Sequence, residues 1–277
     1  MKKETSLTIE KVLRFPIIWM LLGAAAIILV QGLFLISTER VEGIGYLLLT
    51  VLLGFAAILL YKLIMKYVAR RATPELSRQR AGIEAVWGIL TGAIFIVVST
   101  LIIAMMGGYA FHWANAADPS SILLTSIGTA LGAAIVEELV FRGLMLQAIQ
   151  KLGGSWIALA VTSLIFGAFH LGNPGATLWS TLAITLEAGV LLGAAFLWRR
   201  NLWFAMGLHF SWNALEGLLG IPVSGLPADG LFTVEVNGAA LLTGGDFGLE
   251  GSIVTVILGV VIAIPMLIGA AKKRLSN

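Results

Sequence analysis

Eight apolar segments, each close to the ~20 residues that a helix needs to cross a bilayer, dominate the sequence. Of the 277 residues, 58% are hydrophobic and only 12% are charged, whereas a soluble domain typically carries about twice that share of charge. The excess apolar surface predicts an all-α, polytopic membrane bundle. The segments are Ile17–Ile36, Ile44–Leu60, Ile83–Met106, Ile122–Leu139, Trp156–Phe169, Thr177–Trp198, Leu202–Leu219 and Ile253–Ala270.

The basic residues predict how these segments are oriented. If the N-terminus is cytoplasmic, 17 of the 18 Lys and Arg residues, Lys2 and Lys3 among them, fall in cytoplasmic stretches, and only Arg40 falls outside. Cytoplasmic loops of membrane proteins are enriched in Lys and Arg. We therefore predict about eight transmembrane helices with both termini in the cytoplasm, integral to the cell membrane. Because the basic residues follow the topology, the net charge of +3 does not indicate a nucleic-acid partner.

The chain shows no composition shift or linker, so residues 1–277 are predicted to form a single membrane domain. It contains no cysteine, which excludes disulfides, thiolate nucleophiles and cysteine-ligated metal sites.

A group of ionisable and amide side chains interrupts the apolar segments. A charge at the centre of a spanning helix costs roughly 2.5–3.5 kcal/mol on insertion scales, so such residues persist where they have a partner or a function. Two of the three histidines of the chain belong to this group. Its members are Glu137, Glu138, Arg142, His170, Glu187, His209 and Asn213.

Helical spacing sorts the group into pairs. Glu138 and Arg142 are four residues apart, which predicts a shared helix face and an ion pair. Glu137 points about 100° away from Glu138 and is left free. His209 and Asn213 are also four apart and share a face.

A helical hairpin brings two of these residues together. Its turn is predicted at Gly153-Gly154, with Glu137 16 residues before Gly153 and His170 16 residues after Gly154. The two side chains then stand at the same depth and can face each other. His209 reaches this level only if the hairpin protrudes into the cytoplasm, which predicts a site that opens toward the cytoplasmic face.

The residue types suit hydrolysis of an amide bond. A carboxylate and an imidazole that share a water, here Glu137 and His170, form a general-base arrangement. A second imidazole and an amide, His209 and Asn213, can donate hydrogen bonds to an oxyanion. The side chains of Glu137, His170 and His209 are also competent zinc ligands, and the sequence leaves both mechanisms open.

Other designs of membrane peptidase are excluded. The sequence has no His-Glu-x-x-His motif and no serine in a Gly-x-Ser-x-Gly setting. Its only aspartates, Asp118, Asp229 and Asp246, fall in predicted outer loops, so no buried aspartyl pair is available.

Three motifs in order resemble a known family. Residues 137–142 read E-E-x-x-x-R, residues 166–170 read F-x-x-x-H, and residues 209–213 read H-x-x-x-N. On successive membrane helices, they are similar to the CPBP family of CAAX proteases and bacteriocin-processing enzymes, also called the Abi family. The resemblance covers about Ile122–Leu218, and we expect residues 122–218 to form a CPBP-like catalytic core of four helices.

The resemblance implies an intramembrane endopeptidase similar to type II CAAX prenyl endopeptidases, which remove the C-terminal tripeptide from prenylated proteins. The expected substrate is a membrane-anchored or lipidated polypeptide, presented in the lipid bilayer. Glu137 would activate water, with His170 helping to position it. No cofactor is required by this mechanism, which we prefer because the side chains suffice without metal. Zinc is the alternative.

The remaining residues receive supporting roles from the same resemblance. His209 and Asn213 would stabilise the oxyanion, and Glu138 with Arg142 would support the catalytic side chains. The plainer alternative for Glu138 and Arg142 is a buried ion pair that locks two helices. Glu187 matches no motif and is expected to contact the catalytic residues or to line the cavity.

Two other functions use the same side chains. One is a non-enzymatic bacteriocin-immunity or partner-binding protein that holds a peptide in the cavity. The other is a transporter, since buried carboxylates and histidines also relay protons. The transporter ranks last because the sequence shows no inverted repeat.

Overall fold

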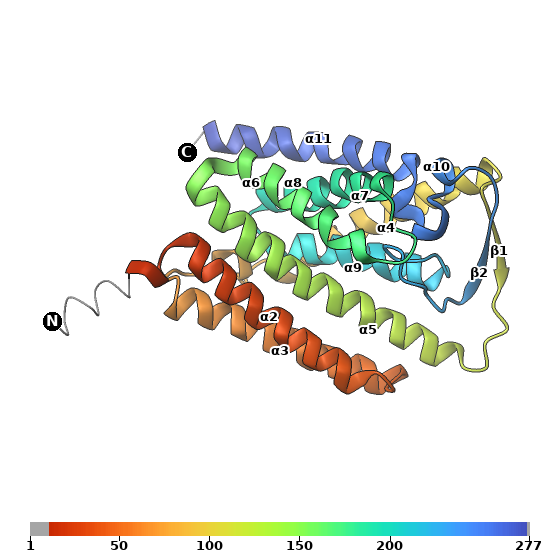
Figure 1. The fold of residues 1–277 in the computed structure, drawn as a ribbon, viewed down its shortest axis with the longest axis horizontal. Helices are drawn as coiled ribbons and strands as arrows, with labels where there is room; N and C mark the ends of the chain where they lie inside the picture. Colours follow the sequence, from red (N-terminus) through yellow and green to blue (C-terminus); the bar gives the residue numbers. More distant parts are fainter. Residues whose placement is uncertain (1–10, 276–277) are drawn as a thin grey trace.

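The computed structural model describes residues 11–275 as a bundle of helices with one short two-stranded ribbon (Figure 1). Lys2 and Lys3, which the sequence places on the cytoplasmic side, lie outside the described residues. The all-α fold class is confirmed. The main elements are α2 (Pro16–Thr38), α3 (Gly43–Tyr67), α4 (Ala81–Met105), β1 (Tyr109–Trp113), α5 (Pro119–Glu138), α6 (Gln147–Phe169), α7 (Leu178–Ile184), α8 (Val190–Arg199), α9 (Leu202–Leu218), β2 (Phe232–Val236), α10 (Ala240–Thr243) and α11 (Ile253–Leu275).

Six helical runs within the described residues are long and apolar enough to cross a membrane. One of them, Pro119–Gly172, is 54 residues long and contains both the fourth and the fifth predicted segments. The seventh predicted segment lies on α9, which has 17 residues. Each predicted segment thus lies on a helix, while the count of eight spans stays a prediction.

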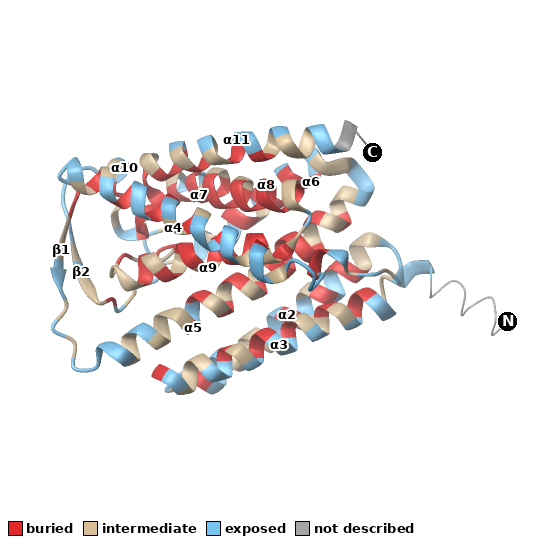
Figure 2. Cartoon of the chain, turned by 180° about the vertical axis from the view of Figure 1, so that it is seen from behind, coloured by how far each residue is buried: buried red, intermediate tan, exposed pale blue. Residues whose placement is uncertain are grey.

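The bundle has an outer layer that is apolar and exposed. Leu29 on α2, Phe55 on α3 and Ile94 on α4 are each more than 60% exposed (Figure 2). In the 18-residue apolar stretch of α2, only 22% of the residues are buried. In the corresponding stretch within Leu178–Arg199, 78% are buried. Such a surface would be insoluble in water and matches lipid tails. The chain is therefore an integral, multi-pass membrane protein, in which the α7–α8 segment is surrounded by other helices.

The molecule has two ends of different composition. At one, which we call the basic end, Lys273 near the end of α11 donates to the carbonyl of Trp198 at the end of α8 (2.9 Å). Lys151 lies over the ring of Trp19 at the same end. At the other, the loop end, β1 pairs antiparallel with β2 from Tyr109↔Val236 to Trp113↔Phe232 (Figure 1). Both lysines thus lie at one end, away from the ribbon, and which end faces the cytoplasm stays a prediction.

The chain reverses direction within the run from α5 to α6. Gly154 has φ 81° and ψ 174°, a backbone conformation that L-residues with a side chain rarely adopt. The predicted turn at Gly153-Gly154 is confirmed. The reversal returns α6 along the bundle, so that His170 at its C-terminal end lies toward the loop end.

Helix α9 packs very closely against α4. A Cβ atom on Gly88 would lie 2.2 Å from the carbonyl oxygen of Phe204, and one on Gly207 would lie 2.4 Å from that of Ala85. Small residues at such contacts let two backbones approach within a membrane. This contact holds α9, the helix that carries His209 and Asn213, in place against its neighbour.

Candidate active site

Two π-helical turns lie beside the ionisable residues. The first, Leu139–Leu146, continues α5 into α6, and the second, Thr185–Gly189, joins α7 to α8. A π turn contains an extra residue, which leaves backbone groups free to bond elsewhere, and such turns occur frequently at functional sites. Arg142 in the first turn donates from Nη2 to the carbonyl oxygens of Ala188 (3.0 Å) and Gly189 (3.2 Å) in the second. The arginine therefore joins the two turns.

Glu138 is the centre of a buried hydrogen-bonded network. Its Oε1 accepts from Nη1 of Arg142 at 2.8 Å and lies 3.0 Å from Nδ1 of His209. Glu138 is 0% exposed and Arg142 is 2% exposed. The predicted ion pair is confirmed. The bond to His209 was not predicted, because the spacing within one helix contains no information about contacts between helices.

This network determines which face of His209 remains available. Oε1 of Glu138 belongs to a carboxylate that is paired with the Arg142 guanidinium, and a carboxylate oxygen only accepts hydrogen bonds. Nδ1 of His209 therefore donates to it. The other ring nitrogen, Nε2, lies 3.9 Å from Oε2 of Glu137. That separation is too long for a direct hydrogen bond, and it lets both atoms contact one water. The structure thus places Glu137 beside His209.

His170 is oriented by its own helix. Its Nδ1 lies 2.8 Å from the carbonyl oxygen of Phe166, and since a carbonyl only accepts, Nδ1 donates. Nε2 of His170 is therefore the nitrogen that is free to act. The ring of Phe166 lies 4.9 Å from the His170 ring and 6.4 Å from the His209 ring, and the Arg142 guanidinium stands 4.8 Å from its centroid. Phe166 is thus the packing residue that separates the three polar groups.

A small cavity lies between these side chains. Its volume is about 20 Å³, which is enough for about one water molecule. The ten residues that line it come from all three motifs, from the second π turn and α8, and from the loop after α9. They are Glu137, Phe166, His170, Ala188, Leu192, His209, Trp212, Asn213, Ser224 and Glu250.

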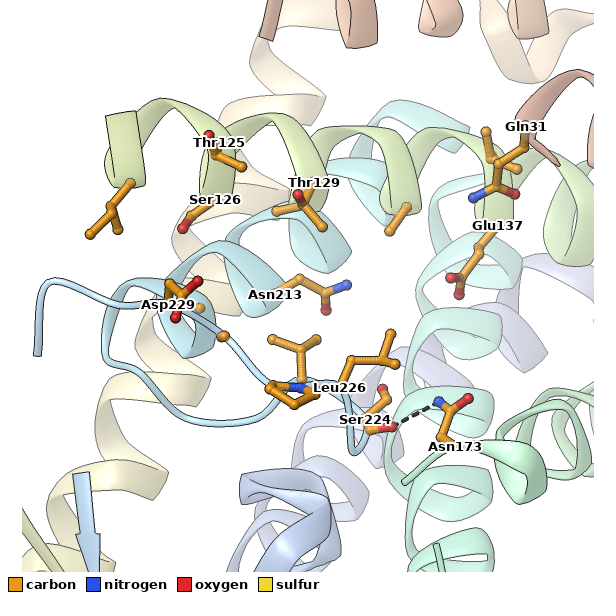
Figure 3. Close-up of a pocket in the computed structure, with 18 of the residues that line it drawn as sticks. Gln31, Thr125, Ser126, Thr129, Glu137, Asn173, Asn213, Ser224, Leu226 and Asp229 are labelled. Atoms are coloured by element: carbon orange, nitrogen blue, oxygen red, sulfur yellow. Dashed lines mark hydrogen bonds between the residues drawn. The ribbon is translucent and has the colours of Figure 1, made fainter. Parts of the chain in front are cut away.

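A second, much larger cavity meets the small one. It has a volume of about 820 Å³ and shares Glu137, His170, Asn213 and Ser224 with the small cavity. In Figure 3, the side chains of Glu137 on α5 and Asn213 on α9 project into the same space. Asn173 closes one side of this space by donating from Nδ2 to the carbonyl of Ser224 (2.7 Å). Clefts of several hundred Å³ are typical of sites that bind a ligand.

The large cavity extends toward the loop end. Its walls include Glu42, Asp118 and Asp229, all of which belong to the connections at that end. The prediction that the site opens at the same end as the basic residues is therefore wrong. The predicted protrusion of the hairpin is present, because Glu137 lies 16 residues before Gly153 and His209 only seven residues after Leu202 at the start of α9, yet the two side chains are 3.9 Å apart. The prediction failed in the end at which the cavity opens.

The candidate zinc ligands do not form a metal site. Among residues 11–275, no group of three or more His, Asp or Glu side chains is arranged to hold a metal ion. Nδ1 of both histidines is occupied by a protein acceptor, and Nε2 of His209 and the carboxylate of Glu137 are 3.9 Å apart. The residues Glu137, His170 and His209 do not fit zinc as they stand, and no step is derived through a metal.

Sequence reasoning missed two parts of the site. Asn173 lies three residues after His170, and only its bond to the loop reveals its role. Glu250 comes from a glycine-rich loop that carries no recognisable motif. Glu187 lines neither cavity, contrary to one of its two expected roles. It is completely buried, and neither of its carboxylate oxygens has a hydrogen-bond partner in the part of the chain that the structure describes.

Comparison with known proteins agrees with the motifs. The family model described as type II CAAX prenyl endopeptidase Rce1-like matches residues 119–215, close to the predicted core at 122–218. A search of curated proteins found no match. The match implies protease activity, and it covers α5 to α9, the helices that carry the network, the two π turns and all three motifs. The resemblance to the CPBP family of membrane proteases is thereby confirmed over this segment of the chain.

Proposed function

We propose that the chain is an intramembrane endopeptidase in which Glu137 activates a water molecule to hydrolyse a peptide bond of a membrane-associated polypeptide. The observation that carries this proposal is the cavity of about 20 Å³ between Glu137, His170, His209 and Asn213. It has the size of one water and is lined by a carboxylate, two imidazoles and an amide. These groups are sufficient for general-base hydrolysis.

The hydrolysis follows from the positions of these groups. The Glu137 carboxylate accepts a proton from the water, whose oxygen forms a bond to the carbonyl carbon of the substrate. When the resulting tetrahedral intermediate collapses, the C–N bond breaks, and the proton held by Glu137 passes to the leaving nitrogen. The products are a carboxylic acid and an amine, and Glu137 returns to its starting form.

The oxyanion of the intermediate needs hydrogen-bond donors. The side-chain amide of Asn213 provides one, because it points into the space beside Glu137 (Figure 3). Since Nδ1 of His209 donates to Glu138, Nε2 of His209 donates only when the ring carries a second proton. Glu137 and Glu138 lie on either side of the ring and can balance that charge. Arg142 and Glu138 thus act by holding His209.

The large cavity supports a polypeptide substrate held partly in the membrane. It connects the site to apolar residues such as Ile28, Ile122 and Phe169, and to the loop end. The substrate would therefore approach from the loop end. If the basic end faces the cytoplasm, as the charge pattern predicts, this is the side of the membrane away from the cytoplasm.

A reconstituted assay tests the function. The purified protein is placed in liposomes with a library of quenched fluorescent peptides that carry a lipid anchor, and cleavage sites are read by mass spectrometry. We expect Glu137→Gln to lower kcat by at least about 10²-fold, because it removes the base while preserving the shape. Glu235→Gln, an exposed change on β2, is the matched control.

Two results would count against the proposal. Full cleavage by Glu137→Gln and by His170→Ala would show that the cavity does not perform the chemistry. Peptide binding that persists in Glu137→Gln, without cleavage by any form of the protein, would favour the partner-binding function instead.

Because the chain has no cysteine, a single Asn237→Cys substitution at the loop end reports orientation through labelling. Cleavage only of peptides on the unlabelled side would contradict the proposed access.

A further inference from the structure

The loop between α9 and α11 folds back into the bundle. Phe247, Leu249 and Glu250 are each at most 3% exposed, although they belong to a connection between helices. Loops usually run over the surface, because a buried loop leaves backbone groups unpaired. A loop that is buried in this way needs many specific hydrogen bonds.

Those hydrogen bonds are present. Nε1 of Trp179 donates to the carbonyl of Gly251 (2.8 Å), and the Thr255 hydroxyl donates to that of Leu249 (2.8 Å). The amide of Gly225 donates to the carbonyl of Phe247 (2.7 Å). The short helical turn Leu249–Gly251 is therefore held from both sides, by α7 and by α11. Its position next to the site is built into the fold.

Glu250 is the residue that this loop brings to the site. It lines the water-sized cavity together with Glu137, His170 and His209. Its Oε2 is buried and has no hydrogen-bond partner within residues 11–275. A buried polar atom without a partner is costly, and few occur in a folded protein. An unpaired carboxylate oxygen in a cavity lined by two histidines therefore calls for a function.

The positions of the two histidines indicate a function for Glu250. Both rings use Nδ1 for a bond to the protein and keep Nε2 free, so neither is fixed on the side where it must act. We propose that Glu250 is a positioning residue of the peptidase site, which orients the imidazole rings of His170 and His209 from the loop side of the water-sized cavity. This role rests on the proposed function, because it serves the same reaction.

The charged neighbours of Glu250 come from several elements. His170 at the end of α6 and His209 on α9 line the same small cavity as Glu250 and favour its ionised form. Glu187 in the second π turn and Glu216 on α9 are its acidic neighbours. Burial raises the pKa of the Glu250 carboxyl, against the opposing effect of a hydrogen bond with Ser224 and of the two histidines.

Substitution of Glu250 tests the role in the full-length protein in liposomes. We expect Glu250→Gln to lower kcat about 10–100-fold, the range found when a side chain that orients an active-site histidine is lost. KM changes by less than about twofold, because Glu250 lines only the small cavity. Glu250→Asp, which keeps the carboxyl group, is expected to restore part of kcat.

The pH–rate profile separates positioning from a structural role. If Glu250 acts on the reacting groups, its loss changes the shape of the pH–rate profile in Glu250→Gln, whereas a purely structural loss lowers the rate equally at every pH. Glu187→Gln is the matched control, since Glu187 is equally buried but lines neither cavity. We expect it to keep the wild-type profile.

The outcomes are distinct. An unchanged kcat and pH profile in Glu250→Gln, in a preparation where Glu137→Gln is inactive, would overturn the role of Glu250 alone. So would equal losses in Glu250→Gln and Glu187→Gln. A wild-type protein without any peptidase activity would overturn the proposed function and this role together. If Glu250→Gln does not fold, Ser224→Ala replaces it, because this change removes the hydroxyl that hydrogen-bonds to the Glu250 carboxyl. A wild-type pH profile in that variant would contradict the proposal.

Discussion

The protein buries two groups of ionisable side chains, which differ in how many hydrogen-bond partners they have. In the first group, Oε1 of Glu138 binds both Arg142 and His209, and Arg142 also binds two backbone carbonyls, while Oε2 of Glu138 has no hydrogen-bond partner within residues 11–275. The second group consists of Glu187, Glu216 and Glu250, which are all buried. Within residues 11–275, no hydrogen-bond partner is found for either oxygen of Glu187 and Glu216 or for Oε2 of Glu250. Both groups lie in the same bundle.

The difference shows what each group contributes. A charge that is paired and hydrogen-bonded can be buried, and its bonds fix the side chains of neighbouring helices. A carboxyl without a partner adds no such constraint, and it lowers stability unless it is protonated or has a task. The first group therefore holds the site in shape. Within the second, only Glu250 reaches the water-sized cavity, which is why the proposed role falls on it and not on Glu187 or Glu216.

The largest effect is expected from breaking the first group. Arg142→Met removes the cation and leaves the Glu138 charge buried with His209 as its remaining partner. Breaking a buried ion pair typically costs about 3–5 kcal/mol, so the variant should unfold at a clearly lower temperature in detergent. Arg200→Met, which removes an exposed side chain bonded to Gln150, should change little. A wild-type Tm in Arg142→Met would mean that the network does not hold the fold.

A smaller effect of the opposite sign is expected in the second group. Glu187→Met replaces an unpartnered buried carboxyl by an apolar side chain of similar length. Removing such a polar group recovers about 1–3 kcal/mol of desolvation cost, so the Tm should rise. Thermal unfolding in the same detergent measures it. A fall in Tm as large as that expected for Arg142→Met would show that Glu187 is bonded as firmly as the first group. The contrast between the two groups would then disappear.

The smallest effect is expected at an exposed carboxylate that is fully satisfied. Asp118 caps α5 by accepting from the Ser120 hydroxyl (2.6 Å) and the Ser121 amide (3.0 Å), and these bonds lower the pKa of Asp118. A lowered pKa means that the cap is complete above the ordinary carboxyl range and is lost as the pH falls through the lowered value. The protection factor of the Ser121 amide against hydrogen exchange should therefore fall as the pH drops through the lowered pKa of Asp118. Asp118→Asn, which caps without ionising, should show no such change.

Local sequence predicted much of the site. The four-residue spacing of Glu138 and Arg142 was enough to predict their ion pair, because one helix determines it. The glycine pair at 153–154 was enough to predict the reversal of the chain. The bond from His209 to Glu138 was beyond reach, since it spans 71 residues and depends on how α9 packs against α5. The direction in which the site opens was predicted wrongly for the same reason.

The sequence by itself determined that this chain is an integral membrane protein, that it is helical, and that residues 119–215 carry the motifs of a membrane protease. Those properties follow from apolar length and from spacing along single helices. Tertiary structure decided which nitrogen of each histidine is free, where the water-sized cavity lies, and that Glu250 lines it. These depend on contacts between segments distant in the chain, and such contacts are set by packing in three dimensions, which no local pattern specifies.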